Sequence, residues 1–390
     1  MNKIRVLQVI PSLAIGGAER CAVQLMGALN SEHFEVAALS LYPRQGTELE
    51  QMLEQRRLSV TFLNKKRGLD VRIFGGVWQQ IQKFRPHIIH THLHAFNYVI
   101  PAVIAGKVQG AVHTIHSVAE RERSRLVKGL PRVLFSRAVA PVAIACEVQA
   151  SIRRVFGVES VLIPNGIPLD VYRSGSRMRA GWRKEQGFQG DDVVFVCVGR
   201  LDPVKNHEVL IDAFARFCRE APRAHLLLVG DGELQLRLKA QVERLKLTRR
   251  VHFLGLRKDV PTILAASDVY AFASDHEGSP LSILEALAAG LPIVGTAVGG
   301  VPEMVTAEAG ILTRPREVDS LASSMKLLYS DAGRRAQMRE AAVKQAARYD
   351  VTRMARCYGH LYTVLLDARS SHWSGAYFAA YASRLREDPS

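Results

Sequence analysis

The sequence predicts an α/β fold with two doubly wound parallel sheets, and three observations support this. The chain has 390 residues, which is more than one hydrophobic core usually organises. Short apolar runs rich in β-branched residues alternate with helical patterns, as in parallel sheets wrapped by helices. A polar, arginine-rich interruption up to Gly190 separates two such series, so we expect two Rossmann-like domains facing a central cleft.

The first domain is expected over residues 1–168. Its first run, Ile4–Ile10, is apolar but too short for a signal sequence, and a glycine loop follows it. This combination favours a buried strand. Six further runs are predicted to be strands, at residues 36–41, 60–63, 87–92, 112–116, 142–145 and 161–163.

The second domain is expected over residues 169–351. Its predicted strands are residues 193–198, 225–229, 251–254, 269–273, 292–295 and 310–312. Beyond Glu317 the pattern is wholly helical, and residues 352–390 are expected to form a helical segment that packs back on the first domain. Aromatic side chains near the end of this segment favour docking over a free tail; they are Trp373, Tyr377, Phe378 and Tyr381.

Composition predicts a globular cytoplasmic protein. Hydrophobic residues make up 48% of the chain and charged residues 23%, which is typical of soluble domains. The cysteines are odd in number, widely spaced and form no CxxC pair, which favours a reducing compartment. No run approaches the roughly 20 apolar residues of a membrane span, so work at a membrane is expected only from its inner surface.

The net charge of +15 is compatible with nucleic acid, anionic lipid or a phosphorylated substrate. Residues 1–170 hold 21 lysines and arginines against 12 acidic residues. One basic cluster comprises Arg56, Arg57, Lys65, Lys66 and Arg67. A denser one at residues 121–137 interleaves basic and apolar side chains, like an amphipathic helix on an anionic bilayer. The alternative is a helix whose apolar face packs on its own domain.

A glycine loop follows the first predicted strand and leads into a helix. Gly16 and Gly17 would let backbone N–H groups approach an anion at the helix N-terminus. Such turns are common in α/β proteins, so the loop alone is weak evidence for a ligand site.

Two permanent cations follow the first strand of the second domain. Arg200 can bind phosphate oxygens bidentately, and Lys205 adds a compact charge nearby. The alternative for Arg200 is a surface ion pair with Asp202 or Glu208.

The most informative segment is Asp275 to Ala286, again after a strand. Ser279 is predicted to cap a helix that has Pro280 at its first position, and Leu281 begins the face that packs on the sheet. Glu277 precedes this helix and Glu285 lies inside it. One carboxylate could meet a donor sugar and the other a ribose, although carboxylates near a helix start also interact favourably with the helix dipole.

These motifs together resemble family-four glycosyltransferases. The shared features are Gly16-Gly17-Ala18-Glu19-Arg20, Gly199-Arg200 with Lys205-Asn206, Glu277 with Glu285 eight residues later, and Gly290-Leu291-Pro292-Ile293-Val294. The resemblance runs from about Ile4 to Tyr362. Its most specific part is the segment with the two glutamates, and the glycine loop is its least specific.

The resemblance implies a GT-B fold and sugar transfer that retains anomeric configuration, with no metal and no cofactor besides the nucleotide diphosphate-sugar substrate. By position, Arg200 and Lys205 would hold the diphosphate, Glu285 the ribose and Glu277 the donor sugar. His116 would lie near the transferred sugar, and the base would be bordered by Leu256 and Arg257.

The chemistry requires stabilisation of negative charge on the departing oxygen, by a metal or by fixed cations. The acidic pattern Asp231-Gly232-Glu233 resembles a turn more than a metal site. Arg200, Lys205 and the helix at Ser279 are therefore the preferred candidates. A retaining glycosidase, with two carboxyl groups about 5 Å apart, is the competing hydrolytic mechanism.

Histidines are concentrated near one predicted strand. His90, His92 and His94 would project to one face of an extended chain. A zinc site is disfavoured here, because zinc needs three or four converging ligands. A position lining the acceptor cleft is preferred for His92 and His94.

Three further possibilities remain. The runner-up enzyme is a nucleotide-sugar epimerase, and an inactive scaffold that binds nucleotide would keep Arg200 and Glu285 without Glu277. A nucleic-acid-binding protein is disfavoured because no recognition module is present. The preferred donor is a uridine diphosphate-sugar, with guanosine second, and the acceptor is a saccharide or a lipid-linked saccharide in glycan or polysaccharide biosynthesis.

Overall fold

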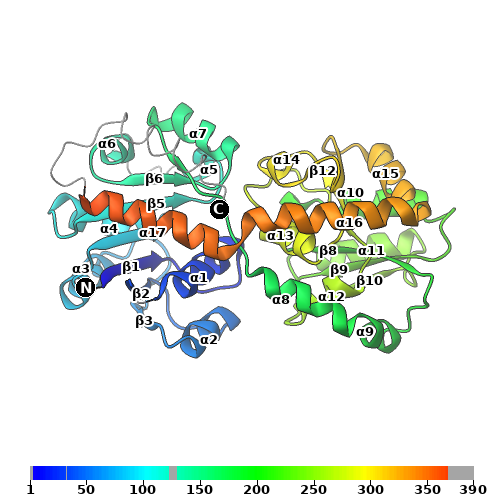
Figure 1. Ribbon diagram of the computed structural model, residues 1–390, viewed down its shortest axis with the longest axis horizontal. Coiled ribbons are helices and arrows are strands. Elements are labelled where there is room, and N and C mark those ends of the chain that lie inside the picture. Colours follow the sequence, from blue (N-terminus) through cyan, green and yellow to red (C-terminus); the bar gives the residue numbers. More distant parts are fainter. Residues whose placement is uncertain (1–2, 32, 123–129, 368–390) are drawn as a thin grey trace. The chain divides into compact units, whose positions relative to one another are not determined.

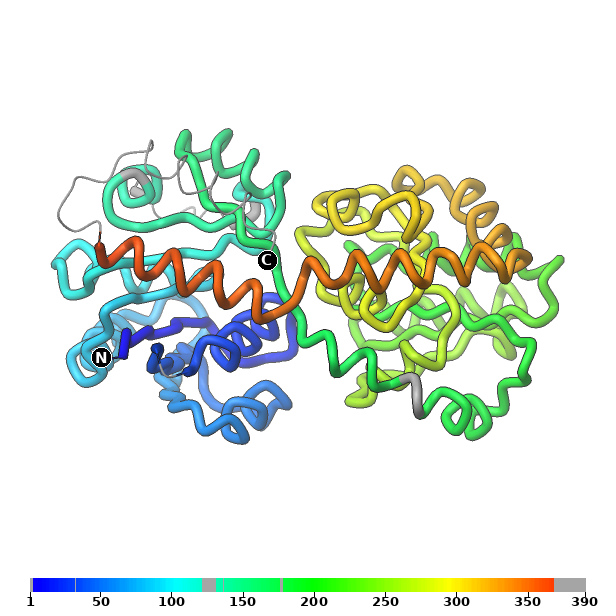
Figure 2. The backbone as a smooth tube through the Cα atoms, viewed as in Figure 1, coloured from blue at the N-terminus to red at the C-terminus, as the bar shows by residue number. Residues whose placement is uncertain are grey.

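Each of the two alternating series folds into its own parallel sheet. The computed structural model describes residues 3–31, 33–122 and 130–367. The chain divides into unit 1, residues 1–166 with 351–390, and unit 2, residues 167–350. The chain passes from unit 1 to unit 2 after Gly166 and returns after Asp350, which can be followed in Figure 2. The first crossing lies two residues before the boundary expected from the sequence.

Unit 1 contains a seven-stranded sheet in the order β3-β2-β1-β4-β5-β6-β7, with all neighbours parallel. Its strands are β1 (Ile4–Ile10), β2 (Phe34–Ser40), β3 (Ser59–Phe62), β4 (Ile88–His92), β5 (Gly110–Ile115), β6 (Ala140–Ala143) and β7 (Val161–Leu162). From β1 the chain adds β2 and β3 on one side of the sheet, and then β4 to β7 on the other side. The position between β1 and β4 is therefore the switch point, where doubly wound sheets bind ligands.

The helices of unit 1 cover this sheet. They are α1 (Gly17–Leu29), α2 (Glu48–Gln55), α3 (Arg72–Phe84), α4 (Phe96–Ile104), α5 (Ala119–Glu122), α6 (Leu130–Arg137), α7 (Cys146–Phe156) and α17 (Val351–Asp367), with a 3₁₀ turn η1 (Leu93–Ala95). The last helix, α17, packs beside α1 and against β5, as Figure 1 shows. The packing of α17 on unit 1 is what the sequence predicts for the segment after residue 352, but the aromatic residues beyond Asp367 lie outside the described residues.

Unit 2 contains a six-stranded parallel sheet in the order β10-β9-β8-β11-β12-β13. Its strands are β8 (Val193–Val198), β9 (Ala224–Val229), β10 (Val251–Gly255), β11 (Val269–Ala271), β12 (Ile293–Thr296) and β13 (Gly310–Thr313). Its helices are α8 (Leu169–Ser174), α9 (Arg179–Glu185), α10 (His207–Phe217), α11 (Gln235–Arg244), α12 (Val260–Ala266), α13 (Leu281–Ala288), α14 (Val301–Met304), α15 (Val318–Ser330) and α16 (Ala332–Ala346), with 3₁₀ turns η2 (Gly175–Met178), η3 (Pro203–Lys205) and η4 (Ala347–Tyr349).

The arginine-rich stretch before Gly190 is a packed part of unit 2. It forms α8, η2 and α9, and Trp182 is buried there. The Arg183 side chain is also buried, and its guanidinium donates to the carbonyl oxygens of Ala266 and Asp192 at 3.1 and 2.7 Å. The charge of this stretch therefore serves packing, because buried carbonyl oxygens need donors.

The second basic cluster of unit 1 is divided between two short helices, α5 and α6, and residues 123–129 between them lie outside the described residues. Leu134 and Phe135 on α6 are buried in the core of unit 1, where Phe135 stacks on Phe96 with ring centroids 5.4 Å apart. For these two side chains the second alternative, an apolar face packed on its own domain, is confirmed. Arg132 and Arg137 remain exposed.

The first basic cluster is also not a uniform surface. Lys65 is buried, and its ammonium donates to neutral oxygens of Tyr42, Lys66 and Gly68 at 3.4, 2.9 and 2.5 Å. The other four members are exposed. None of the described helices is both long and apolar enough to span a bilayer.

Candidate active site

The predicted donor residues of unit 2 follow the carboxyl ends of neighbouring strands. Lys205 lies in the loop after β8, and Glu277 lies in the loop after β11, the next strand in the sheet. The Lys205 ammonium is 2.6 and 2.9 Å from the two carboxylate oxygens of Glu277. Carboxyl ends of adjacent parallel strands share one edge of the sheet, and this is why residues 72 positions apart meet.

A short polar network holds Glu277 in place. Its side chain is only 10% exposed, and the Ser274 hydroxyl donates to its Oε1 at 2.6 Å. The backbone oxygen of Ser274 in turn accepts from Thr296 Oγ1 at the end of β12 at 2.6 Å. The carboxylate is therefore paired with one cation and one hydroxyl, which satisfies the requirement for a buried charge.

Asp275, beside this network, fixes the loop from its outer side. Its carboxylate accepts a bidentate pair from Arg316 at 3.1 and 2.8 Å and a bond from Asn206 at 3.1 Å. The hydrogen bonds from Arg316 are the main reason that the pKa of Asp275 lies below its usual value. Ser274 and Arg316 are supporting residues that the sequence did not reveal, because nothing in their local spacing distinguishes them from ordinary loop residues. Asp275 begins the segment that the sequence singles out, but no role is predicted for it there.

Arg200 lies on the same loop as Lys205 but in a different environment. Its side chain is 76% exposed and forms an ion pair with Asp202 at 2.8 Å. This is one of the two surface pairs that the sequence leaves open as an alternative to phosphate binding. Since an exposed ion pair contributes little stability, Arg200 can exchange Asp202 for a ligand at small cost.

Two glycines after β9 support the Arg200 loop. Gly230 has φ +140°, and a Cβ atom there would lie 1.9 Å from the carbonyl oxygen of Gly199. A Cβ atom on Gly232 would lie 2.5 Å from the carbonyl oxygen of Leu201. The pattern Asp231-Gly232-Glu233 is therefore a turn packed on the loop after β8, with Leu201 N–H donating to Asp231 O at 3.0 Å.

Helix α13 begins one residue later than the sequence predicts. Leu281 is its first residue and Pro280 its N-cap, so Ser279 is the residue before the cap. The Ser279 hydroxyl lies 3.8 Å from the sulfur of Met304. The prediction of a Ser279 cap is wrong. Pro280 has an extended backbone, with ψ 119°, and this conformation is typical of an N-cap residue and not of the first helical residue.

Glu285 lies inside α13 and is buried. The Tyr172 hydroxyl on α8 donates to its Oε1 at 2.8 Å. Arg257 and Leu256 follow β10, where Leu256 is exposed and Arg257 pairs with Asp259 at 2.7 Å. This pairing lowers the pKa of Asp259 below its usual value.

In unit 1, Gly16 caps α1 in an extended conformation, with φ −153°. A Cβ atom at Gly16 would lie 2.3 Å from the Oε2 atom of Glu19, whereas Gly17 has open space around its Cα. A carboxylate thus already lies over the first turn of α1, where the helix dipole favours negative charge.

His116 follows β5 and contacts a second histidine. Its Nε2 atom lies 2.9 Å from Nδ1 of His92. Burial is the main cause that lowers the pKa of His116 to about 3, and the charge of His113 adds to it. At neutral pH the ring is therefore uncharged.

The predicted face of three histidines is only partly formed. His90 and His92 are buried on one face of β4, but His94 lies in η1, is exposed and contacts the ring of Tyr42 with centroids 6.4 Å apart. Across the described part of the chain, no group of three or more His, Cys, Asp or Glu residues could hold a metal ion.

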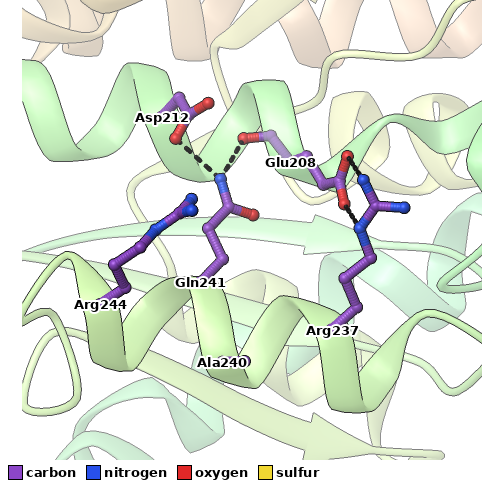
Figure 3. A pocket seen from close by; sticks show the side chains of 6 residues that line it. All are labelled: Glu208, Asp212, Arg237, Ala240, Gln241 and Arg244. Carbon is purple, nitrogen blue, oxygen red and sulfur yellow. Dashed lines mark hydrogen bonds and ion pairs between the residues drawn. The ribbon is translucent and has the colours of Figure 1, made fainter.

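A polar hollow of about 360 Å³ lies between α10 and α11 of unit 2 (Figure 3). Its side chains bind one another: Arg237 pairs with Glu208 at 2.5 Å, and Gln241 Nε2 donates to Asp212 Oδ1 at 2.7 Å. The hollow is a polar contact between two helices and includes none of the predicted site residues.

Two family models together match most of the chain. Residues 15–171 match the family described as Glycosyltransferase Family 4, and residues 178–345 match Glycosyl transferases group 1. The chain is 29% identical to the UDP-Gal:alpha-D-GlcNAc-diphosphoundecaprenol alpha-1,3-galactosyltransferase of Escherichia coli, over 84% of this chain and 88% of the relative. It is 32% identical to a GDP-mannose-dependent mannosyltransferase of Corynebacterium glutamicum that acts on a monoacylated phosphatidylinositol monomannoside, over 45% of this chain and 48% of the relative.

Solved structures share the fold. HepE of Anabaena, crystallised with UDP, superimposes with a TM-score of 0.78 at 24% identity, over 92% of this chain and 99% of HepE. WaaG, a glycosyltransferase involved in lipopolysaccharide biosynthesis, gives 0.72 at 18% identity, over 92% of this chain and all of WaaG, 100%. The predicted fold class, two Rossmann-like domains of the GT-B type, is confirmed.

Proposed function

The chain belongs to the family-four glycosyltransferases, and from this premise we propose that it is a retaining, metal-independent hexosyltransferase. Its donor is a nucleotide diphosphate-sugar, with a UDP-sugar as the first choice, and its acceptor is a saccharide or lipid-linked saccharide in glycan biosynthesis. The observation that carries the proposal is the contact of Lys205 with Glu277 at the carboxyl edge of the unit 2 sheet, at 2.6 and 2.9 Å.

This arrangement can bind both the phosphate and the sugar of a sugar diphosphate. The Lys205 ammonium has three donors and uses two on Glu277, so the third is available for a phosphate oxygen of the leaving group. Glu277, held by Ser274, can accept hydrogen bonds from hydroxyls of the donor sugar. Arg200, after leaving Asp202, would add a second positive charge to the diphosphate.

The choice of donor rests on relatives. HepE was crystallised with UDP and with UDP-glucose, and the Escherichia coli relative is described as using UDP-Gal. The mannosyltransferase of Corynebacterium glutamicum is GDP-mannose-dependent, so guanosine is the second choice.

The test is a donor screen by thermal stabilisation, followed by turnover of the best donor with excess EDTA. We expect a UDP-sugar to raise the melting temperature most and turnover to persist in EDTA, with product of the same anomeric configuration. Loss of turnover in EDTA that Mg²⁺ restores would contradict metal independence, and inverted product would contradict retention.

The central variant is Lys205→Met, for which we expect kcat to fall on the order of 100-fold or more because a preorganised charge is lost. Lys326→Met is the control, since it removes a lysine of unit 2 whose partner, Glu220, is exposed. Glu277→Gln should couple to Lys205→Met in a double-mutant cycle. Additive effects of the two substitutions would contradict the shared role.

A lipid-linked acceptor is supported by the undecaprenol-linked substrate named for the Escherichia coli relative and by the basic composition of residues 1–170. If the protein works on a membrane surface, it should co-sediment with anionic liposomes at low salt and be released by high salt. Neutral liposomes are the control, and equal sedimentation with both would contradict an electrostatic attachment.

A further inference from the structure

The loop after β3, residues 65–72, exposes two apolar side chains on the surface of unit 1. Leu69 is 66% exposed and Val71 is 69% exposed. Among the large apolar side chains that are exposed in the described part of the chain, no other two lie within two residues of each other. Exposed apolar surface that is rimmed by polar residues is typical of interaction sites.

The charge of this loop is positive. It holds four basic residues and one acidic residue. The acidic residue, Asp70, is buried, and its carboxylate accepts two hydrogen bonds from the guanidinium of Arg72, at 2.9 and 2.8 Å. Asp70 and Arg72 therefore offset each other. The charges that the loop presents to solvent are those of Lys66 and Arg67, which are both exposed.

Buried contacts fix the backbone of the loop. Lys65 is buried, and its ammonium donates to the carbonyl oxygens of Lys66 and Gly68 at 2.9 and 2.5 Å. Gly68 has φ +80°, a left-handed conformation that turns the chain at this point. The backbone N–H of Asp70 donates to the hydroxyl of Tyr98 on α4 at 3.3 Å. The apolar side chains of the loop are therefore held in solvent by a backbone that is tied to unit 1.

An anionic bilayer surface is a partner for both kinds of side chain. Its negative headgroups attract lysine and arginine near the surface. Below the headgroups, the boundary of the acyl region accepts apolar side chains to a depth of about 5–10 Å. A stable protein interface involves about 20–30 residues on each side, which is more than a loop of residues 65–72 supplies. The composition and size of the loop therefore favour a bilayer over a protein partner.

We propose that loop 65–72 is the contact of this protein with an anionic membrane surface. Leu69 and Val71 insert between the lipid headgroups, and Lys66 and Arg67 bind the headgroup phosphates. This inference rests on the proposed function, in which the acceptor is a lipid-linked saccharide.

The position of the loop in unit 1 agrees with this role. It follows the carboxyl end of β3, the edge strand of the sheet (Figure 1). Ligands of doubly wound sheets bind at this carboxyl edge, so the contact would keep a lipid-linked acceptor close to the edge where it binds. The loop is a different segment from residues 121–137, of which Leu134 and Phe135 are already packed in the core of unit 1.

The charges are tested with vesicles of phosphatidylcholine and phosphatidylserine at physiological salt, with vesicles of phosphatidylcholine alone for comparison. For Lys66→Gln combined with Arg67→Gln, we expect binding of the full chain to the anionic vesicles to weaken about 30-fold, since each surface cation contributes about fivefold. The matched control is Lys83→Gln combined with Arg85→Gln, two exposed charges at the other end of α3. This end lies about 18 Å away, beyond the Debye length of about 8 Å, so the control should bind like the wild type.

The apolar contact is tested with Leu69→Ser combined with Val71→Ser. We expect binding to weaken about tenfold or more and the same ratio to persist at high salt, because salt does not screen apolar burial. Ile104→Ser is the matched control, since Ile104 is 64% exposed at the end of α4. The urea midpoints should stay unchanged in both variants, because exposed side chains contribute little to stability.

Equal binding of the wild type and the two loop variants would overturn the inference, and so would equal losses in the loop variants and their controls. A protein contact predicts a different result, in which Leu69→Ser with Val71→Ser changes the oligomeric state in light scattering and leaves vesicle binding unchanged. That result would also overturn the inference. The donor screen does not depend on the loop, so a protein that binds no vesicles would refute the membrane contact and leave the proposed sugar transfer standing.

Discussion

Arg200 and Lys205 lie on one loop and carry the same charge, but their surroundings differ. The Arg200 side chain is 76% exposed beside Asp202, whereas Lys205 is 23% exposed and bonded to the buried Glu277. A buried pair is costly to break, and an exposed pair contributes little. A substitution of Arg200 should therefore change ligand binding with little effect on stability, whereas a substitution of Lys205 should change both.

For Arg200→Ala we expect an unchanged urea midpoint and a fall in kcat/KM for the donor on the order of 100-fold, because only the ligand contact is lost. Arg216→Ala is the control, since Arg216 pairs with the exposed Asp319. If Arg200→Ala leaves donor kinetics unchanged, the residue is only a surface partner of Asp202.

At the scale of elements, the loop after β8 depends on glycines in the loop after β9. Gly230 has φ +140° and abuts the carbonyl oxygen of Gly199, the residue before Arg200. Left-handed backbone of this kind is strained for any residue with a Cβ atom. The position of the phosphate-binding candidates is thus set by a neighbouring strand.

Gly230→Ala should lower the free energy of unfolding by about 1–3 kcal/mol through backbone strain and raise the donor KM by displacing Arg200. Gly181→Ala in α9 is the control, because no atom would lie within 4 Å of its Cβ. That substitution should stabilise the protein by about 0.4–1 kcal/mol. Urea unfolding and donor kinetics measure both, and a harmless Gly230→Ala would contradict the role of this contact.

At the scale of the whole molecule, the histidines of unit 1 make stability depend on pH. Burial lowers the pKa of His113 to about 4 and is the main cause that lowers the pKa of His116 to about 3; it also lowers the pKa of His90 and His92 well below the ordinary value of 6.5. Protons therefore bind the unfolded chain more tightly than the folded one. The stability contributed by these groups is complete above pH 6.5 and is lost as the pH falls toward 4 and 3.

Urea unfolding at a series of pH values should show the free energy of unfolding declining below pH 6.5, by up to about 1.4 kcal/mol per pH unit for each such histidine. A His113→Asn variant, which lacks one titrating ring, should show a shallower slope. A free energy that is constant from pH 7 to pH 5 would contradict the burial of neutral histidines.

The extent of prediction from sequence differs between backbone and side chains. The two sheets, the loops that carry Lys205 and Glu277, and the helix with Glu285 all follow from local periodicity and from turn residues. The N-cap of α13 was misplaced by one residue, because Ser279 and Pro280 are both acceptable at a helix start and only the backbone angles distinguish them. Leu134 and Phe135 of α6 were equally ambiguous until their packing was known.

The sequence by itself determined the order of strands and helices along the chain and the residues that follow each strand. The reason is that hydrophobic period and turn chemistry are local properties of the chain. Only the tertiary structure decided which side chains meet. Glu277 pairs with a lysine 72 positions away, and His90 bonds to a tyrosine 272 positions away. Such partners are selected by sheet order and by the packing of α17, and both depend on long-range burial that no local pattern records.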